Sequence, residues 1–102
     1  MEMLLTGDAI DAATALRWGL VNKMVPQSEV LQSAMDYARR IAANAPLAVQ
    51  AAKELALRSR DLDLASGLRM EQLFLRLLQT SDDVTEGAAA FSEKRAPRFK
   101  GT

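Results

Sequence analysis

The chain has 102 residues, of which 49% are hydrophobic and 25% are charged, and its thirteen basic residues balance thirteen acidic ones. This composition is typical of one globular domain with a modest core, and it excludes an intrinsically disordered chain. The zero net charge argues against nucleic acid as a partner, because binding phosphates needs a surplus of positive charge. No apolar run reaches the roughly 20 residues that a membrane span requires, so we expect no membrane partner.

Cysteine and histidine are both absent. A chain without cysteine has no disulfide framework, which fits a cytoplasmic protein. It also has no Ser-His or Cys-His nucleophile pair and no thiolate or imidazole metal ligand. Any catalysis would have to use carboxylates, lysines, Tyr37 or backbone amides, and we assign no catalytic and no metal-binding residue.

The first helical signals come early in the chain. Met1–Leu5 is an apolar run without a capping residue, and it leads into a turn signal at Gly7. We interpret this run as the end of a helix whose beginning is missing. Asp11 is a suitable N-cap for a short helix over 12–18, and Gly19 is the residue expected just after its end.

Two longer helices are predicted after a short extended segment at 20–25. Ser28 caps a helix that runs to about residue 44, with its apolar residues on one stripe. Pro46 stands where a first-turn proline is tolerated, and a second helix is predicted over 47–58.

The most apolar helix is predicted over 64–79, with Asp61 or Asp63 as its N-cap. Its apolar residues reach nearly all round the helix, so a single core contact cannot cover them. Either this helix is the centre of the bundle, or its second face meets another subunit. We expect a share of both, because a small chain cannot bury a helix completely.

The next stretch begins as a capped helix. Thr80 and Ser81 are both suitable N-caps, and three carboxylates complement the positive end of the helix dipole: Asp82, Asp83 and Glu86. As part of a helix start these carboxylates need no further role. As an acid/base pair they would have to converge in a pocket with separated pKa values.

The same helix carries an apolar face of Val84, Ala88 and Phe91. Lys94 follows Phe91 by three residues on the same side, and Pro97 prevents the helix from continuing. An aromatic ring beside an ammonium suits a flat ring that carries phosphate. The alternative is a core phenylalanine next to a solvated lysine.

Together these segments predict an all-α fold, an irregular bundle of about five helices with one short extended segment, in a single module over 1–102. Residues 82–101 read D-D-x-x-E-G-x-x-A-F-x-x-K-R-x-P-x-F-K-G, which resembles the C-terminal signature of the enoyl-CoA hydratase/isomerase (crotonase) family. Residues 5–22 are similar to that family's L-T-G-x-x-I-x-A-x-x-A-x-x-x-G-L-V-N segment. Pro46 and Ala51–Lys53 resemble its later S/A-P-x-A-x-x-x-x-K helix, so the resemblance is colinear over nearly the whole chain.

The resemblance implies a helical C-terminal region of a two-part enzyme. In the family, an N-terminal spiral domain supplies the oxyanion hole and the acid/base glutamates, and that domain would precede residue 1 here. The chain is therefore expected to be inactive and to bind no cofactor by itself. The whole enzyme would be a lyase of fatty acid metabolism that hydrates 2-enoyl-CoA, or alternatively an isomerase or another crotonase-type enzyme, with a coenzyme A thioester as substrate.

The resemblance also implies roles in assembly and in coenzyme A contact. Phe91 and Lys94 match family residues that contact coenzyme A bound by a neighbouring subunit, with the ring on the adenine side and the ammonium on a phosphate. A homo-oligomer is expected, a trimer or a dimer of trimers in the full enzyme, and self-association of the chain alone. The alternative is a free-standing helical module that binds a protein partner, and the length of the source protein would discriminate between the two.

Overall fold

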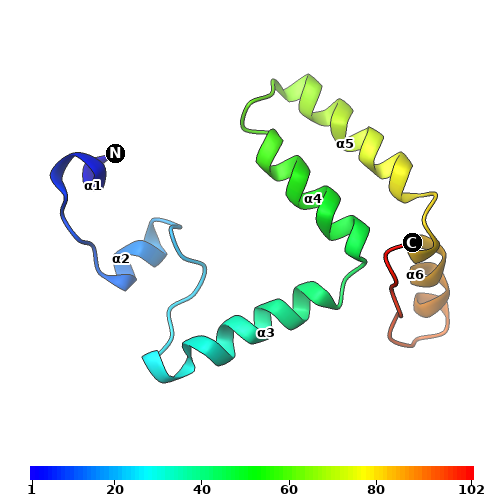
Figure 1. Cartoon of the computed structure of the whole chain (residues 1–102), viewed down its shortest axis with the longest axis horizontal. Coiled ribbons are helices and arrows are strands. Elements are labelled where there is room, and N and C mark those ends of the chain that lie inside the picture. The colour runs from blue at the N-terminus through cyan, green and yellow to red at the C-terminus, as the bar shows by residue number, and fades with distance from the viewer. The chain divides into compact units, whose positions relative to one another are not determined.

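A computed structural model describes residues 1–102 as all-helical, with no β-strand (Figure 1). The all-α prediction is confirmed, and residues 20–25 lie outside any helix. Most helix bounds agree with the sequence prediction to within two residues. The elements are α1 (Glu2–Thr6), α2 (Ala12–Arg17), a 3-10 turn (Gln27–Glu29), α3 (Val30–Ala42), α4 (Pro46–Arg58), α5 (Leu64–Leu78) and α6 (Asp82–Ser92).

The chain divides into two compact units, Met1–Asp36 and Tyr37–Thr102. In the first unit, the Asp11 carboxylate accepts a hydrogen bond of 2.7 Å from the backbone N–H of Thr14, as an N-cap should. That bond holds the pKa of Asp11 below its usual value. The predicted cap of α2 is confirmed.

The end of α2 is a Schellman motif built on a glycine. The amide of Gly19 donates to Leu16 O at 3.1 Å, and the amide of Leu20 donates to Ala15 O at 2.9 Å. Gly19 has φ +75°, a left-handed backbone that costs glycine little. The sequence prediction of Gly19 as the residue after the helix end is confirmed.

In the second unit, α4 and α5 run side by side (Figure 1). Pro46 is the first residue of α4, as predicted. Of the two candidate caps for α5, the structure uses Asp63, whose carboxylate accepts from the N–H of Ser66 at 2.9 Å and from its hydroxyl at 2.7 Å. These bonds lower the pKa of Asp63.

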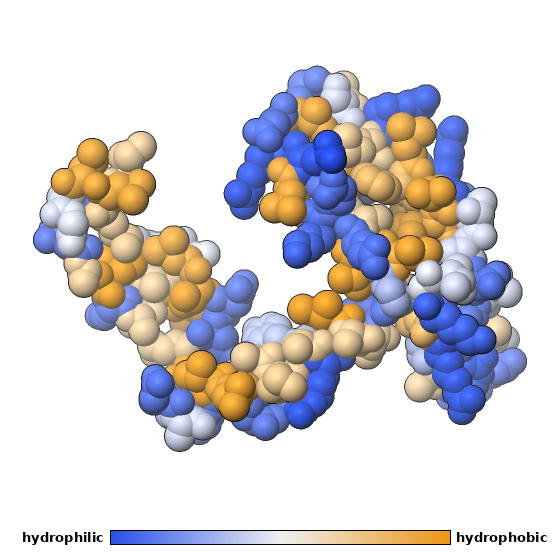
Figure 2. Space-filling view, viewed as in Figure 1, coloured by the Kyte–Doolittle hydropathy of each residue, from blue (hydrophilic) through white to orange (hydrophobic).

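Few side chains are enclosed within this chain. Ala90 and Asp83 are the two buried residues, and Figure 2 shows apolar side chains at the surface of both units. The helix α5 is therefore not the enclosed centre of a bundle, and its outward apolar residues stay about half exposed or more: Leu68, Leu73, Leu75 and Leu77, with Leu64 at its start. None of the helices is both long and apolar enough to cross a bilayer.

Candidate functional site

The first backbone amide of α6 is hydrogen-bonded by the last residue of the chain. Ser81 is the N-cap, but its side chain makes no capping bond. Instead, the backbone N–H of Asp82 donates to the carbonyl of Thr102 at 2.8 Å. The hydroxyl of Thr80 is turned back to Leu77 O at 2.7 Å, so neither of the two predicted caps uses its side chain on α6.

The Asp83 carboxylate fixes the last residues of the chain. Its side chain accepts from the backbone N–H of Lys100 at 2.7 Å and of Gly101 at 2.9 Å, and the residue is only 4% exposed. Gly101 has φ +78°, and a Cβ there would lie 3.3 Å from the Pro46 side chain. The tail (residues 93–102) therefore returns along α6 and reaches the start of α4.

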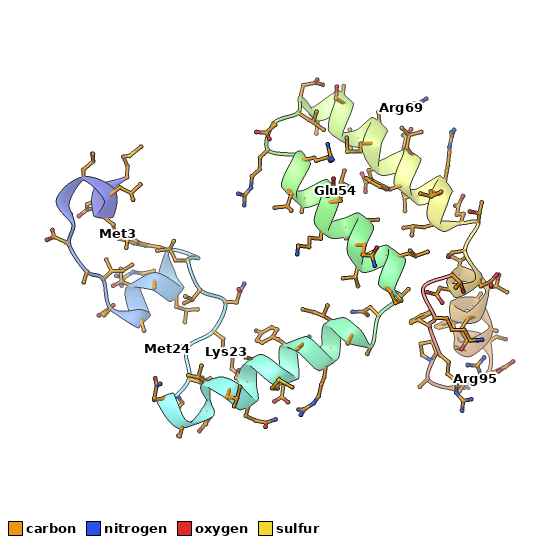
Figure 3. All side chains as sticks on the ribbon, in the orientation of Figure 1. Met3, Lys23, Met24, Glu54, Arg69 and Arg95 are labelled. Carbon is orange, nitrogen blue, oxygen red and sulfur yellow. The ribbon has the colours of Figure 1, made fainter.

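The Glu86 carboxylate holds the middle of the tail. It accepts from the two terminal guanidinium nitrogens of Arg95, Nη1 at 2.6 Å and Nη2 at 3.0 Å, and from the backbone N–H of Arg98 at 2.7 Å. The bonds from Arg95 and then from Arg98 lower the pKa of Glu86 to about 2. Arg95, which Figure 3 labels at the turn after α6, also donates to Glu93 at 2.6 Å, and both partners raise its pKa.

The acidic start of α6 therefore does more than complement a helix dipole. Asp83 and Glu86 direct their oxygens at backbone amides and at a guanidinium of the tail, so they do not form the acid/base pair that was the alternative. No local sequence signal predicted these bonds, because the joined residues lie 9 to 18 positions apart.

The helix α6 ends at Ser92, before the predicted end, in a second Schellman motif. The amide of Lys94 donates to Phe91 O at 3.3 Å, and the amide of Arg95 donates to Ala90 O at 3.0 Å. Lys94 has φ +54° and is the one non-glycine residue with a left-handed backbone. That conformation costs a residue with a side chain about 1–2 kcal/mol. Lys94 thus lies in the turn beyond the helix, and this turn, not a continuing helix, places it relative to Phe91.

Both predicted site residues are accessible. Phe91 is 89% exposed and Lys94 is exposed, so the alternative of a core phenylalanine is wrong for this chain. All three residues of the predicted apolar face, Val84, Ala88 and Phe91, are exposed, and Phe91 is more exposed than Val84. The Lys94 ammonium makes no ion pair within residues 1–102, whereas the neighbouring Arg95 is used internally.

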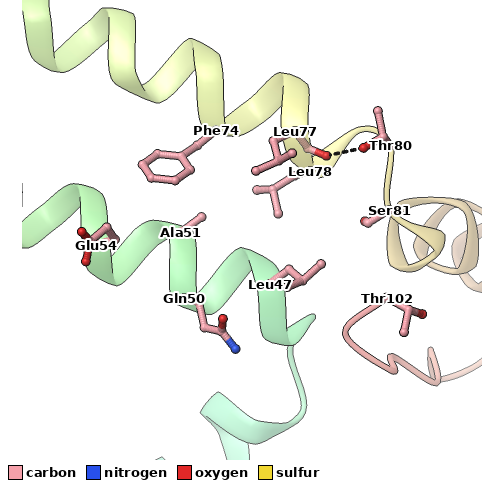
Figure 4. A pocket seen from close by; sticks show the side chains of 10 residues that line it. All are labelled: Leu47, Gln50, Ala51, Glu54, Phe74, Leu77, Leu78, Thr80, Ser81 and Thr102. Atoms are coloured by element: carbon pink, nitrogen blue, oxygen red, sulfur yellow. Dashed lines mark hydrogen bonds between the residues drawn. The ribbon is translucent and has the colours of Figure 1, made fainter.

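A groove between α4 and α5 is a feature that the sequence did not predict. Its cavity volume is about 570 Å³, and Figure 4 shows side chains from both helices and from the start of α6 around it. Glu54 on α4, labelled in Figure 3, is its only side-chain carboxylate, and it is half-buried and paired with Arg58. Residues 1–102 hold no group of three potential metal-ligating side chains. One paired carboxylate in an apolar groove provides no acid/base pair.

The sequence comparisons agree with the resemblance of the motifs. A profile of the family described as enoyl-CoA hydratase/isomerase matches residues 1–102. The chain is 45% identical to (E)-benzylidenesuccinyl-CoA hydratase of Thauera aromatica over 101 residues, which is 99% of this chain and 40% of that protein. It is 41% identical to carnitinyl-CoA dehydratase of Proteus mirabilis, over 98% of this chain and 40% of that protein.

Solved structures give the same picture. An enoyl-CoA hydratase from Mycobacterium marinum superposes with a TM-score of 0.93 at 41% identity, covering 100% of this chain and 42% of that one. An enoyl-CoA hydratase from Bacillus anthracis superposes with a TM-score of 0.95 at 39% identity, covering 99% and 39%. The chain spans about two fifths of the length of the relatives that it matches.

Proposed function

Because the chain belongs to the enoyl-CoA hydratase/isomerase family, we propose that it serves coenzyme A contact and subunit assembly in an acyl-CoA hydratase. The two curated relatives are a hydratase and a dehydratase of CoA esters, which supports hydration or its reverse as the reaction class. An isomerase or another crotonase-type reaction is the alternative within the family. We further propose a cytoplasmic homo-oligomer that acts in fatty acid metabolism.

The exposed pair Phe91 and Lys94 carries this proposal. The ring of Phe91 is 89% exposed, so a flat partner that stacks on it would bury its apolar area. An adenine is such a partner, and a phosphate of the same ligand would meet the Lys94 ammonium as a point charge. The exposed leucines of α5 support the assembly role, since large apolar patches mark interaction surfaces.

The test is a titration of the isotopically labelled chain with coenzyme A, followed residue by residue by NMR. Because the chain carries only part of the proposed site, it should not retain coenzyme A, but at millimolar ligand we expect weak amide shifts centred on Phe91 to Arg95 with coenzyme A, and none with pantetheine, which lacks the nucleotide. Phe91→Ala should weaken the affinity about tenfold, because base stacking is worth ~1–3 kcal/mol. Lys94→Ala should weaken it about threefold to fivefold, the value of an exposed charge pair.

Lys53→Ala is the matched control, because this exposed lysine lies on α4 away from the pair. The translational diffusion of the same sample reports self-association. Shifts that are absent at millimolar coenzyme A, or that map elsewhere, would contradict the coenzyme A contact. With self-association also absent, they would favour the free-standing module that binds a different protein.

A further inference from the structure

The turn after α6 places Lys94 in a backbone conformation that is unfavourable for a lysine. A left-handed backbone at φ +54° disfavours any residue with a Cβ, and glycine is the usual choice at this place in a Schellman motif. A lysine that stays in this conformation has to be held there by the structure around it. The residues on either side of Lys94 therefore need anchors of their own.

Glu86 is placed to supply one of these anchors. Its carboxylate binds the Arg95 guanidinium through two hydrogen bonds, at 2.6 and 3.0 Å, and the Arg98 N–H through a third, at 2.7 Å. These are the residues on the far side of Lys94, while the near side is anchored in α6 by the amide of Glu93, which donates to Ala89 O at 2.9 Å. Lys94 is thus fixed from both sides by groups that belong to one helix.

Glu86 does not lie on the side of α6 that carries the exposed ring. Residues on an α-helix turn by about 100° each, so Phe91 lies about 140° round α6 from Glu86. The carboxylate is only 24% exposed, and its hydrogen bonds are all to the tail. Glu86 therefore lies on a different side of α6 from Phe91, and its carboxylate oxygens are already bonded to the tail.

We propose that Glu86 is a positioning residue for the coenzyme A contact, which orients the Lys94 ammonium beside Phe91 by holding Arg95 and the Arg98 amide. The proposal rests on the coenzyme A contact proposed for Phe91 and Lys94. It assigns recognition of the nucleotide base to Phe91. It assigns recognition of phosphate to Lys94, together with the Glu86–Arg95 ion pair that holds the turn on which Lys94 lies.

The test compares two ligands that differ only in phosphate. Adenosine probes the ring contact, and adenosine 3′,5′-bisphosphate probes the ring and phosphate contacts together. Their affinities for the full chain, its Glu86→Gln variant and its Lys94→Ala variant are measured from amide shifts. Glu86→Gln keeps the shape of the side chain and an acceptor for the Arg98 amide, but it removes the charge that pairs with Arg95.

We expect Glu86→Gln to lose the about threefold to fivefold advantage that phosphate adds, as Lys94→Ala does, with the affinity for adenosine unchanged. The strong intraresidue NOE between the Lys94 amide and α protons, a mark of positive φ, should weaken in the same variant. Asp82→Asn is the matched control, since it makes the same charge change on an exposed residue of the same helix. It should change neither affinity.

Each other outcome has a separate meaning. If the unaltered chain shifts with neither ligand, the proposed function fails, and this inference fails with it. If it binds both and Glu86→Gln keeps the phosphate advantage, the inference is overturned and the function stands. An equal loss for both ligands would overturn the inference too, because it would make Glu86 merely structural. If Glu86→Gln does not fold, Arg95→Lys is the second variant, because lysine keeps the positive charge but cannot make the bidentate pair with Glu86.

Discussion

The helices α2 and α6 end in the same backbone conformation, but with different residues at the left-handed position. Each ends in a Schellman motif with a left-handed residue just beyond the helix, at φ +75° for Gly19 and φ +54° for Lys94. The turn at Gly19 is made by backbone hydrogen bonds to Leu16 O and Ala15 O. Beyond Lys94, the tail is bonded in addition by the side chains of Asp83 and Glu86 of the same helix.

The two turns differ in the cost of their backbone conformation and in the side-chain bonds that support them. A glycine makes the turn at little cost, and such a turn needs no support. A lysine makes it at a cost, and the structure supplies two carboxylates that hold the tail beyond it. The supported turn is also the one that presents an exposed ring and an ammonium, so the additional bonding lies where the coenzyme A contact is proposed.

The largest effect is expected when the support is removed at Asp83. Asp83→Ala should lower the free energy of opening the tail by about 3 kcal/mol, because two backbone amides lose a buried, charged acceptor. Hydrogen exchange of the Lys100 and Gly101 amides measures this opening. Asp82→Ala, the exposed neighbour, should change it by less than about 0.5 kcal/mol. Equal protection in both variants would show that Asp83 does not hold the tail.

A smaller effect is expected from exchanging the residue types at the two turns. Gly19→Ala should cost α2 about 1 kcal/mol, because a Cβ at Gly19 meets no atom within 4 Å and only the backbone is strained. Lys94→Gly should stabilise the end of α6 by about 0.5–1 kcal/mol, since relief of the strain is partly offset by the entropy that glycine loses. Exchange of the Leu20 and Arg95 amides reports the two turns. A loss of stability in Lys94→Gly would mean that the lysine side chain itself supports the turn.

Protonation of Glu86 should affect stability only in acid. There it should weaken the tail after α6 and leave the end of α2 unchanged. The pKa of Glu86 falls from 4.5 to about 2 in the folded chain, so its contribution to stability is complete above about pH 4.5. That contribution is lost as the pH falls toward 2 and the carboxylate binds a proton. The amide shift of Arg98 should follow this titration, and it should be flat in Glu86→Gln. A midpoint at or above pH 4.5 would contradict the ion pair.

The helices themselves could be predicted because their signals are local. Asp11 caps a helix three residues on, Gly19 ends it, Asp63 caps α5 and Pro46 opens α4, and each signal acts within one turn of the chain. The predicted end of α6 was too late because Pro97 was taken as the stop. Lys94 carries no sequence signal for a left-handed backbone, which is the property of glycine and asparagine.

By itself, the sequence determined the family, the helical class, the N-caps of α2 and α5, and the identity of Phe91 and Lys94 as the residues that match the family motif. Only the tertiary structure decided that Phe91 faces solvent, that Lys94 lies in a left-handed turn, and that Asp83 and Glu86 hold the tail. The physical reason is the distance along the sequence over which each interaction acts. Capping and helical periodicity act over three or four residues, whereas the bonds of the tail join residues up to 18 apart and exist only once the chain has turned back on α6.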